Sequence, residues 1–223
     1  QSYLCSGTLL NNTASNHAPY FLTANHCISS QSRASTVEAW WFYRAAACES
    51  SSLDSRFTRT YGGGSLLYAS DRTDTSFMRL NQAPPAGSVF AGWWPSPLAV
   101  GSNVVGLHHP GGYPQKISSG NLSGYADCTW LADGSDYFSC IGTSESAAEY
   151  LSVSPSSGTW EPGSSGSGLY TTINGRHYLV GQLLGGPPGC SSTQRFGRFD
   201  VAFRAALNRW LQPGTAMTLS VNK

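Results

Sequence analysis

Hydrophobic residues along this chain occur in short runs that turn-forming residues interrupt. Segments rich in β-branched and aromatic residues alternate with stretches of Gly, Ser, Asn and Pro, a pattern typical of an all-β protein. One segment near the end differs, because its apolar positions recur at helical spacing and share one face: Phe203, Leu207, Trp210 and Leu211. Pro213 and Gly214 follow and predict the end of this helix.

Composition limits the possible classes of protein. The chain has 223 residues, enough for one two-lobed β domain or two small domains with a sizeable core. Only 11% of the residues are charged, the formal net charge is +1 and no long basic run occurs, so nucleic acid is not an expected partner. No apolar run approaches the roughly 18 residues needed to span a bilayer, so no membrane association is expected.

Three chemically complementary groups occur in the order His26, Asp74, Ser165. A serine hydroxyl is a poor nucleophile until an imidazole takes its proton, and a carboxylate must fix the tautomer of that imidazole. Ser165 lies in the run Gly-Ser-Ser-Gly-Ser-Gly at 163–168, where glycines allow a sharp turn that aims backbone N–H groups at an oxyanion. A flexible linker has a similar composition, but Glu161 and Pro162 before the run and the apolar strand after it argue against one.

Five stretches of the chain together resemble the chymotrypsin-fold serine endopeptidases, and among these the secreted bacterial lysyl endopeptidase group. The matching stretches are residues 5–14, 20–27, 107–111, 161–167 and 181–187. The resemblance implies an all-β fold of two six-stranded antiparallel β-barrel lobes with a C-terminal helix. It also implies one serine protease domain over residues 1–223, with an N-terminal lobe at about 1–90 and a C-terminal lobe at about 91–212.

Carried over residue by residue, the resemblance assigns His26, Asp74 and Ser165 to the catalytic triad and the N–H groups of Gly163 and Ser165 to the oxyanion hole. Asp71 competes with Asp74, but only Asp74 stands at the start of a short apolar strand that ends in leucine six residues later, as in the family. The adjacent His108 and His109 also match the family. We interpret them as structural, because neighbouring residues on a strand point to opposite faces and cannot readily bind one metal.

The residues that select the substrate are Gly185, Gly186 and Gln194 by the same resemblance. Gly185 and Gly186 would pair with the substrate as an added strand. In the lysyl enzymes an aspartate meets the substrate lysine at the position that Gln194 occupies here. A neutral glutamine removes the charge that offsets burial of an ammonium group, so a neutral or broad P1 preference is expected in place of strict lysine specificity.

Six cysteines in a weakly charged chain indicate an oxidising compartment. A cytosolic zinc site is the alternative, but no Cys-x-x-Cys pair or histidine spacing supports it, and no metal or cofactor is expected. By resemblance Cys5 pairs with Cys27, and spacing alone suggests a hairpin closed by Cys128 and Cys140. Two further cysteines leave two alternatives open, a bond to each other or bonds to an N-terminal segment preceding residue 1, which we favour: Cys48 and Cys190.

The sequence thus predicts a secreted, bacterial, monomeric serine endopeptidase that acts on proteins or peptides. Gln1 is expected to be a processed or truncated end, with a secretory signal and a pro-segment in the precursor. Two rival interpretations remain, a catalytically inactive homologue that acts as a binding protein and a secreted glycan-binding or cell-wall-lytic protein. The second would use its tryptophans for stacking, but no carboxylate pair typical of a glycosidase stands out.

Overall fold

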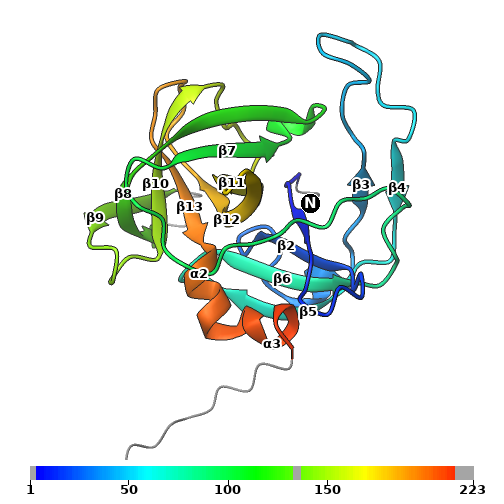
Figure 1. Ribbon diagram of the computed structural model, residues 1–223, viewed down its shortest axis with the longest axis horizontal. Helices are drawn as coiled ribbons and strands as arrows, with labels where there is room; N and C mark the ends of the chain where they lie inside the picture. Colours follow the sequence, from blue (N-terminus) through cyan, green and yellow to red (C-terminus); the bar gives the residue numbers. More distant parts are fainter. Residues whose placement is uncertain (1–3, 133–136, 214–223) are drawn as a thin grey trace, which may run out of the picture.

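The computed structural model describes residues 4–132 and 137–213 of the chain. Its strands form two β structures that lie one above the other, and a helical segment ends the described chain below them (Figure 1). The predicted helix end at Pro213 falls at the edge of the described residues, and Gln1 and Gly214 lie outside them.

The lower β structure comes from the N-terminal part of the chain. Its four antiparallel strands stand in the order β1-β2-β6-β5: β1 (Thr8–Leu10), β2 (Tyr20–Ala24), β5 (Gly64–Ser70) and β6 (Thr75–Leu80). A short helix, α1 (Gln31–Ala34), follows β2. Two further strands, β3 (Ala39–Trp41) and β4 (Thr58–Thr60), pair only with each other in the described chain.

The ribbon of β3 and β4 stands apart from the four-stranded sheet at one side of the molecule (Figure 1). Its own side chains hold it together, because Trp40, Tyr43 and Phe57 form a cluster with ring centroids 5.0–5.5 Å apart. The guanidinium of Arg59 lies 4.0 Å from the centroid of the Trp40 ring, a cation–π contact. In the described chain the N-terminal lobe thus has six strands, but as a four-stranded sheet and a separate two-stranded ribbon and not as the closed six-stranded barrel that was predicted.

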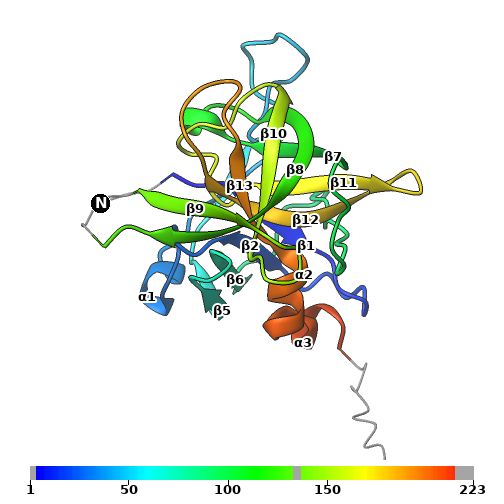
Figure 2. The same ribbon diagram turned by 90° about the vertical axis from the view of Figure 1, so that its left-hand side faces the viewer.

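The upper β structure is a barrel that six antiparallel strands close in the order β10-β13-β12-β11-β7-β8, with β8 pairing back to β10. A seventh strand, β9, extends β8 outward as a hairpin (Figure 2). The strands have these bounds: β7 (Asn103–His108), β8 (Lys116–Trp130), β9 (Phe138–Thr143), β10 (Tyr150–Ser157), β11 (Gly168–Ile173), β12 (Arg176–Gly185) and β13 (Gln194–Arg198). A single 3₁₀ turn, η1 (Pro110–Gly112), joins β7 to β8.

Each β structure has its own buried core. Leu151, Val153, Leu169 and Phe196 are among the residues that fill the barrel. A second cluster lies between the four-stranded sheet and the helical segment α2 (Phe199–Ala202), η2 (Phe203–Leu207) and α3 (Asn208–Leu211). The predicted helix face packs into this cluster, with three buried residues and the half-buried Trp210: Phe203, Leu207 and Leu211.

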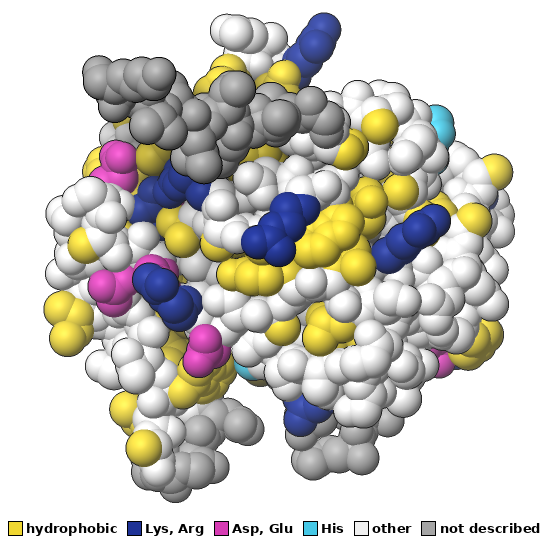
Figure 3. Space-filling model, turned by 90° about the horizontal axis from the view of Figure 1, so that it is seen from below, with side chains coloured by type: hydrophobic (Ala, Val, Ile, Leu, Met, Phe, Trp, Pro, Cys, Tyr) yellow, Lys and Arg dark blue, Asp and Glu magenta, His cyan; other side chains and the backbone are white. Residues whose placement is uncertain are grey.

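The predicted fold class, a two-lobed all-β protein with a C-terminal helix, is confirmed, while the residue bounds of the lobes stay a prediction. None of the helices in the described chain is long and apolar enough to cross a membrane. On the face seen in Figure 3, Lys and Arg side chains lie between hydrophobic and uncharged polar surface.

Candidate active site

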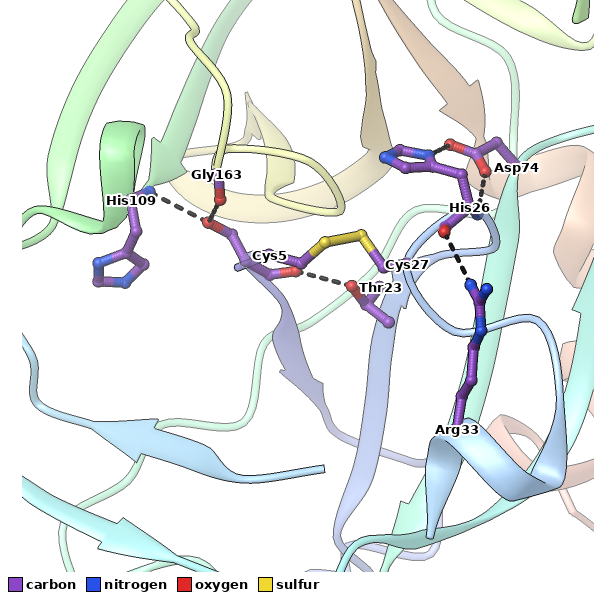
Figure 4. Close-up of a disulfide and its surroundings, with 9 residues drawn as sticks. Cys5, Thr23, His26, Cys27, Arg33, Asp74, His109 and Gly163 are labelled. Carbon is purple, nitrogen blue, oxygen red and sulfur yellow. Dashed lines mark hydrogen bonds and ion pairs between the residues drawn. A yellow bond between two sulfur atoms is a disulfide. The ribbon is translucent and has the colours of Figure 1, made fainter. Parts of the chain in front are cut away.

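His26 and Asp74 meet where the two central strands of the four-stranded sheet, β2 and β6, have their ends towards the barrel. His26 follows the end of β2, and Asp74 directly precedes β6, the strand that pairs with β2. The Nδ1–H of His26 donates to Asp74 Oδ2 over 2.7 Å, and the backbone N–H of His26 donates to Asp74 Oδ1 over 2.8 Å (Figure 4). The carboxylate thus fixes both the backbone and the ring of His26.

The surroundings of the two side chains differ strongly. The Asp74 side chain is 1% exposed and the His26 side chain 26% exposed. Burial raises the pKa of the Asp74 carboxyl, while the hydrogen bonds from His26 favour its ionised form. Because Asp74 occupies Nδ1, Nε2 is the ring nitrogen of His26 that remains for another partner.

Gln182 holds the Asp74 segment in place from the other lobe, and the sequence analysis missed this residue. Asp74 has a φ of +49°, in the left-handed region that a non-glycine residue rarely adopts. The side-chain amide of Gln182, in β12, donates to the backbone oxygens of Thr73 and Asp74 over 2.8 and 3.2 Å and contacts Thr75 Oγ1 at 2.9 Å. Because Gln182 is fully buried, these contacts anchor the strained turn to the barrel.

A disulfide and one backbone hydrogen bond connect Ser165 to the strand of His26. Cys5 bonds to Cys27, the residue after His26 (Figure 4). The neighbouring Ser6 donates its backbone N–H to the carbonyl of Ser165 over 2.7 Å. Gly166 lies against the end of β2, since a Cβ built on it would fall 2.7 Å from the backbone nitrogen of Ala24. The segment around Ser165 therefore packs directly on the residues that lead into His26.

Of the three serines in the glycine-rich run, only Ser165 retains accessible surface. Ser164 and Ser167 are fully buried, whereas Ser165 is half-buried. The Ser165 hydroxyl makes no hydrogen bond with any residue of the described chain, His26 included. Such contacts are often loose in unliganded sites and tighten when substrate binds.

Two backbone N–H groups of this loop point away from its protein contacts. Gly111 donates to the carbonyl of Pro162 over 2.6 Å, which directs the N–H of the same Pro162–Gly163 peptide to the opposite side. The Gly163 carbonyl accepts from Ser6 Oγ over 3.0 Å. Within the described ranges, the N–H groups of Gly163 and Ser165 donate to no other residue. The two predicted oxyanion donors therefore remain available to a ligand.

An aromatic wall lies between His26 and the predicted substrate-pairing strand. The Trp130 ring packs on the His26 ring with centroids 5.5 Å apart, and Phe138 packs on Trp130 at 5.4 Å. A Cβ on Gly185 would lie 3.5 Å from the Phe138 ring. The sequence analysis considered tryptophans only for stacking in a glycan-binding protein, because nothing in the chain order shows that the β8–β9 hairpin brings Trp130 to His26.

Trp130 also lines a cavity of about 610 Å³, and His26 is not among the residues around that cavity. Asp71, Asp127 and Glu149 line it together with Arg72, and Arg72 forms an ion pair with Glu149. Asp71, the competitor of Asp74 for the triad, thus lies on this cavity and makes no contact with His26.

The predicted specificity residues lie together at the adjacent ends of β12 and β13. A Cβ on Gly186 would fall 2.6 Å from Gln194 Oε1. Gln194 is 1% exposed, and its amide donates to the carbonyls of Pro187 and Ser192 over 3.3 and 3.1 Å. The neutral side chain is therefore built into its own loop, with its oxygen facing Gly186.

Disulfides join Cys5 to Cys27 and Cys128 to Cys140, the latter across β8 and β9. Cys48 and Cys190 are exposed and unpaired in the described chain. The sulfurs of Cys5 and Cys27 and a ring nitrogen of His26 lie within 4.8 Å of one another. The two sulfurs are bonded to each other, however, and offer no thiolate to a metal.

These features define the class of protein: the fold is that of the chymotrypsin-like serine proteases. Two solved structures show the same fold. The thermostable serine protease AL20 from an extremophilic microorganism has a TM-score of 0.60 and 12% identity, covering 95% of this chain and 91% of that chain. The active form of the Rv3671c protease from M. tuberculosis has a TM-score of 0.52 and 15% identity, covering 89% and 70%.

The sequence comparisons identify the family within this class. The family "Lysyl endopeptidase, C-terminal domain" matches residues 1–200, and the chain belongs to it. A curated relative, the lysyl endopeptidase of Pseudomonas aeruginosa, is 37% identical over 195 residues, which cover 86% of this chain. The chain spans 39% of the length of that relative. The resemblance inferred from the sequence is confirmed.

Proposed function

We propose that this protein is a secreted serine endopeptidase that hydrolyses peptide bonds through an acyl-enzyme. Ser165 is the nucleophile, His26 the general base and then the general acid, and Asp74 the carboxylate that orients His26. One observation carries the proposal: the buried Asp74 carboxylate binds Nδ1 of His26 beside a loop with one accessible serine and two free N–H groups.

The hydrogen-bond geometry supports the role of each group. Because Asp74 accepts from Nδ1–H, the lone pair of His26 lies on Nε2, where it takes the proton of Ser165 as Oγ attacks the peptide carbonyl. The N–H groups of Gly163 and Ser165 stabilise the negative oxygen, worth about 3–4 kcal/mol per donor by analogy with a measured oxyanion hole. His26 then protonates the leaving amine, and a water attacks the acyl-enzyme by the reverse path.

His108 is the rival candidate for the base, since it too contacts serine hydroxyls. It is fully buried, however, and both ring nitrogens already bind a serine, Ser164 or Ser118. Among the residues that the structure describes, no carboxylate binds either nitrogen of its ring. A base must reach the reacting atoms, so His26 fits the role and His108 does not.

For the P1 residue we propose a neutral or broad preference. The curated relative is named a lysyl endopeptidase, but Gln194 offers no negative charge to a buried ammonium, whose desolvation would go uncompensated. Glu161, the acidic residue just before the Ser165 loop, is exposed, where water screens its charge.

Digestion of a mixture of denatured proteins, with every new terminus mapped by mass spectrometry, tests both parts of the proposal. Cleavage after neutral or mixed residues, abolished by Ser165→Ala, is the expected result. Cleavage confined to lysine would retain the enzyme class and overturn the P1 proposal. Cleavage no greater than that of Ser165→Ala would overturn the endopeptidase and favour an inactive binding protein.

We further propose that the protein works as a monomer and that Cys48 and Cys190 hold an N-terminal segment through disulfides. Their exposure in a chain with two other disulfides supports this second point. Mass spectrometry of the protein secreted from its complete gene, with and without reductant, is the test. A second peptide released by reductant is expected, and free thiols at both positions would refute the link.

A further inference from the structure

A fully buried histidine, His108, lies behind the loop that carries Ser165. It ends strand β7, and its side chain bridges two serines from different parts of the barrel. Its Nδ1 is 2.8 Å from the hydroxyl of Ser164, and its Nε2 is 2.9 Å from the hydroxyl of Ser118 in β8. The Trp160 ring stacks beside the imidazole with centroids 5.7 Å apart.

The neighbours of the two serines determine which atom donates in each of these bonds. Ser118 Oγ donates its single hydrogen to the carbonyl of Thr159 over 3.2 Å, so Nε2 of His108 must carry the hydrogen in its bond to Ser118. In the neutral ring Nδ1 is then an acceptor, and it receives the hydrogen of Ser164. Ser164 Oγ in turn accepts the backbone N–H of Glu161 over 3.4 Å.

The result is a directed chain of hydrogen bonds that starts in the Ser165 loop and ends at Thr159, between the end of β10 and that loop. It runs from Glu161 N–H through Ser164 to His108, and from His108 through Ser118 to the Thr159 carbonyl. Each of the two hydroxyls accepts one hydrogen bond and donates one, while Nδ1 of His108 accepts and Nε2 donates. Burial keeps the ring neutral, because it lowers the pKa of His108 to about 4, with a smaller contribution from His109.

Ser164 stands between the two residues whose N–H groups face the oxyanion, Gly163 and Ser165. The peptide that carries the Ser165 N–H is bonded to the Cα of Ser164, and the peptide that carries the Gly163 N–H lies one residue before it. A Ser164 side chain held in one position therefore restricts the orientation of both peptides. We propose that His108 is a positioning residue that fixes the oxyanion-binding form of this loop through Ser164. The inference rests on the proposed function and adds a part to it, since His108 touches neither substrate nor reacting atoms.

Two substitutions separate the halves of this chain. His108→Asn places an amide oxygen near the position of Nδ1 and keeps an acceptor for Ser164. His108→Gln places an amide nitrogen near Nε2 and keeps only the donor for Ser118. His177→Gln is the matched control, because His177 is an exposed histidine in β12 whose ring contacts Thr172 Oγ1.

We expect His108→Gln to lower kcat about 10- to 100-fold with little change in KM, because the loss falls on transition-state stabilisation. His108→Asn should retain most of kcat, and His177→Gln should match the parent. Rates are divided by the concentration of active sites from burst titration, so that poorly folded material does not count. Affinity for a peptide aldehyde, whose adduct carries the oxyanion, should fall with kcat.

The expected tautomer is tested without any activity measurement. The ¹⁵N shifts of the ring of His108 should report hydrogen on Nε2 and none on Nδ1 at neutral pH. Hydrogen on Nδ1, or equal kcat per active site in the two variants, would overturn the inference and leave only a stabilising role. If the parent protein itself hydrolyses no peptide, the proposed function fails, whatever tautomer is found.

Discussion

Gly166→Ala tests most sharply how the Ser165 loop packs on the strand of His26. Gly166 has a φ of +78° and faces the backbone at the end of β2. A Cβ on it would lie 2.2 Å from Thr23 Oγ1, 2.6 Å from the carbonyl oxygen of Ser6 and 2.7 Å from the nitrogen of Ala24. Two of these three atoms are backbone and cannot rotate away.

Gly175→Ala is the matched control. Gly175 forms the turn between β11 and β12 with a φ of +74°, nearly that of Gly166, and its Cβ would meet nothing within 4 Å. Both substitutions therefore incur the same backbone strain of about 1–2 kcal/mol. Any difference between them comes from the collision at Gly166 alone.

The size of that difference follows from the contact distances. A retreat of roughly 0.8 Å returns the new methyl group to ordinary contact with the Ser6 oxygen. A displacement near 1 Å in a reacting group costs about 100-fold in rate, and overpacking a buried contact costs about 1–3 kcal/mol of stability. Gly166→Ala should thus lower kcat/KM about 100-fold. Its free energy of unfolding should be about 1–3 kcal/mol lower than that of Gly175→Ala.

The assay combines urea unfolding of both variants with kcat/KM on one peptide substrate. Gly175→Ala should keep the parental kcat/KM despite its loss of stability. Equal kcat/KM in the two variants would refute the packing of the Ser165 loop on β2.

Three further results are expected. Asp74→Asn should lower kcat about 10⁴-fold, because an amide binds the wrong tautomer of the histidine. Asp71→Asn, on the neighbouring cavity, is the control and should change kcat little. Comparable losses of kcat in the two variants would exclude Asp74 as the orienting carboxylate. The free energy of unfolding should fall by about 3 kcal/mol as the pH drops from about 6.5 to 4. The reason is that His108 binds a proton in the unfolded chain, whereas in the folded protein its lowered pKa keeps the ring unprotonated. Urea unfolding at several pH values in this range should show that the free energy of unfolding depends on pH in the parent and no longer does in His108→Asn. The same pH dependence in both proteins would contradict the buried neutral ring. Gln194→Asp should raise the ratio of kcat/KM for peptides with lysine at P1 to kcat/KM for peptides with a neutral P1 residue about tenfold or more, because the new carboxylate supplies a partner for the ammonium. An unchanged ratio in peptide assays would show that residue 194 does not meet P1.

Local patterns explain how much of the fold the sequence predicted. Alternating short strands indicated the all-β class, and helical spacing indicated the face of the C-terminal helix that Leu207 and Leu211 bury. The first lobe was harder to predict. Residues 42–57 form a long connection between β3 and β4, whose aromatic side chains stabilise the ribbon apart from the main sheet.

The triad candidates were visible in the sequence because each lies in a short, chemically distinctive motif. The contacts that hold them were not visible, even where the residue itself had been singled out, as His108 was. Gln182 binds the Asp74 segment across both lobes, and His108 binds Ser164 from another strand. Such contacts depend on how distant segments fold together, and an isolated glutamine or histidine carries no local sign of them. Trp130 was underestimated for the same reason.

The most direct test of the central claim is covalent labelling by a fluorophosphonate, which reacts only with an activated serine. The labelled peptide is located by mass spectrometry in the parent protein, in Ser165→Ala and in Ser167→Ala. A single adduct on Ser165, absent from Ser165→Ala and retained in Ser167→Ala, is the predicted result. An adduct on another serine, or none in a folded parent protein, would contradict the proposed nucleophile.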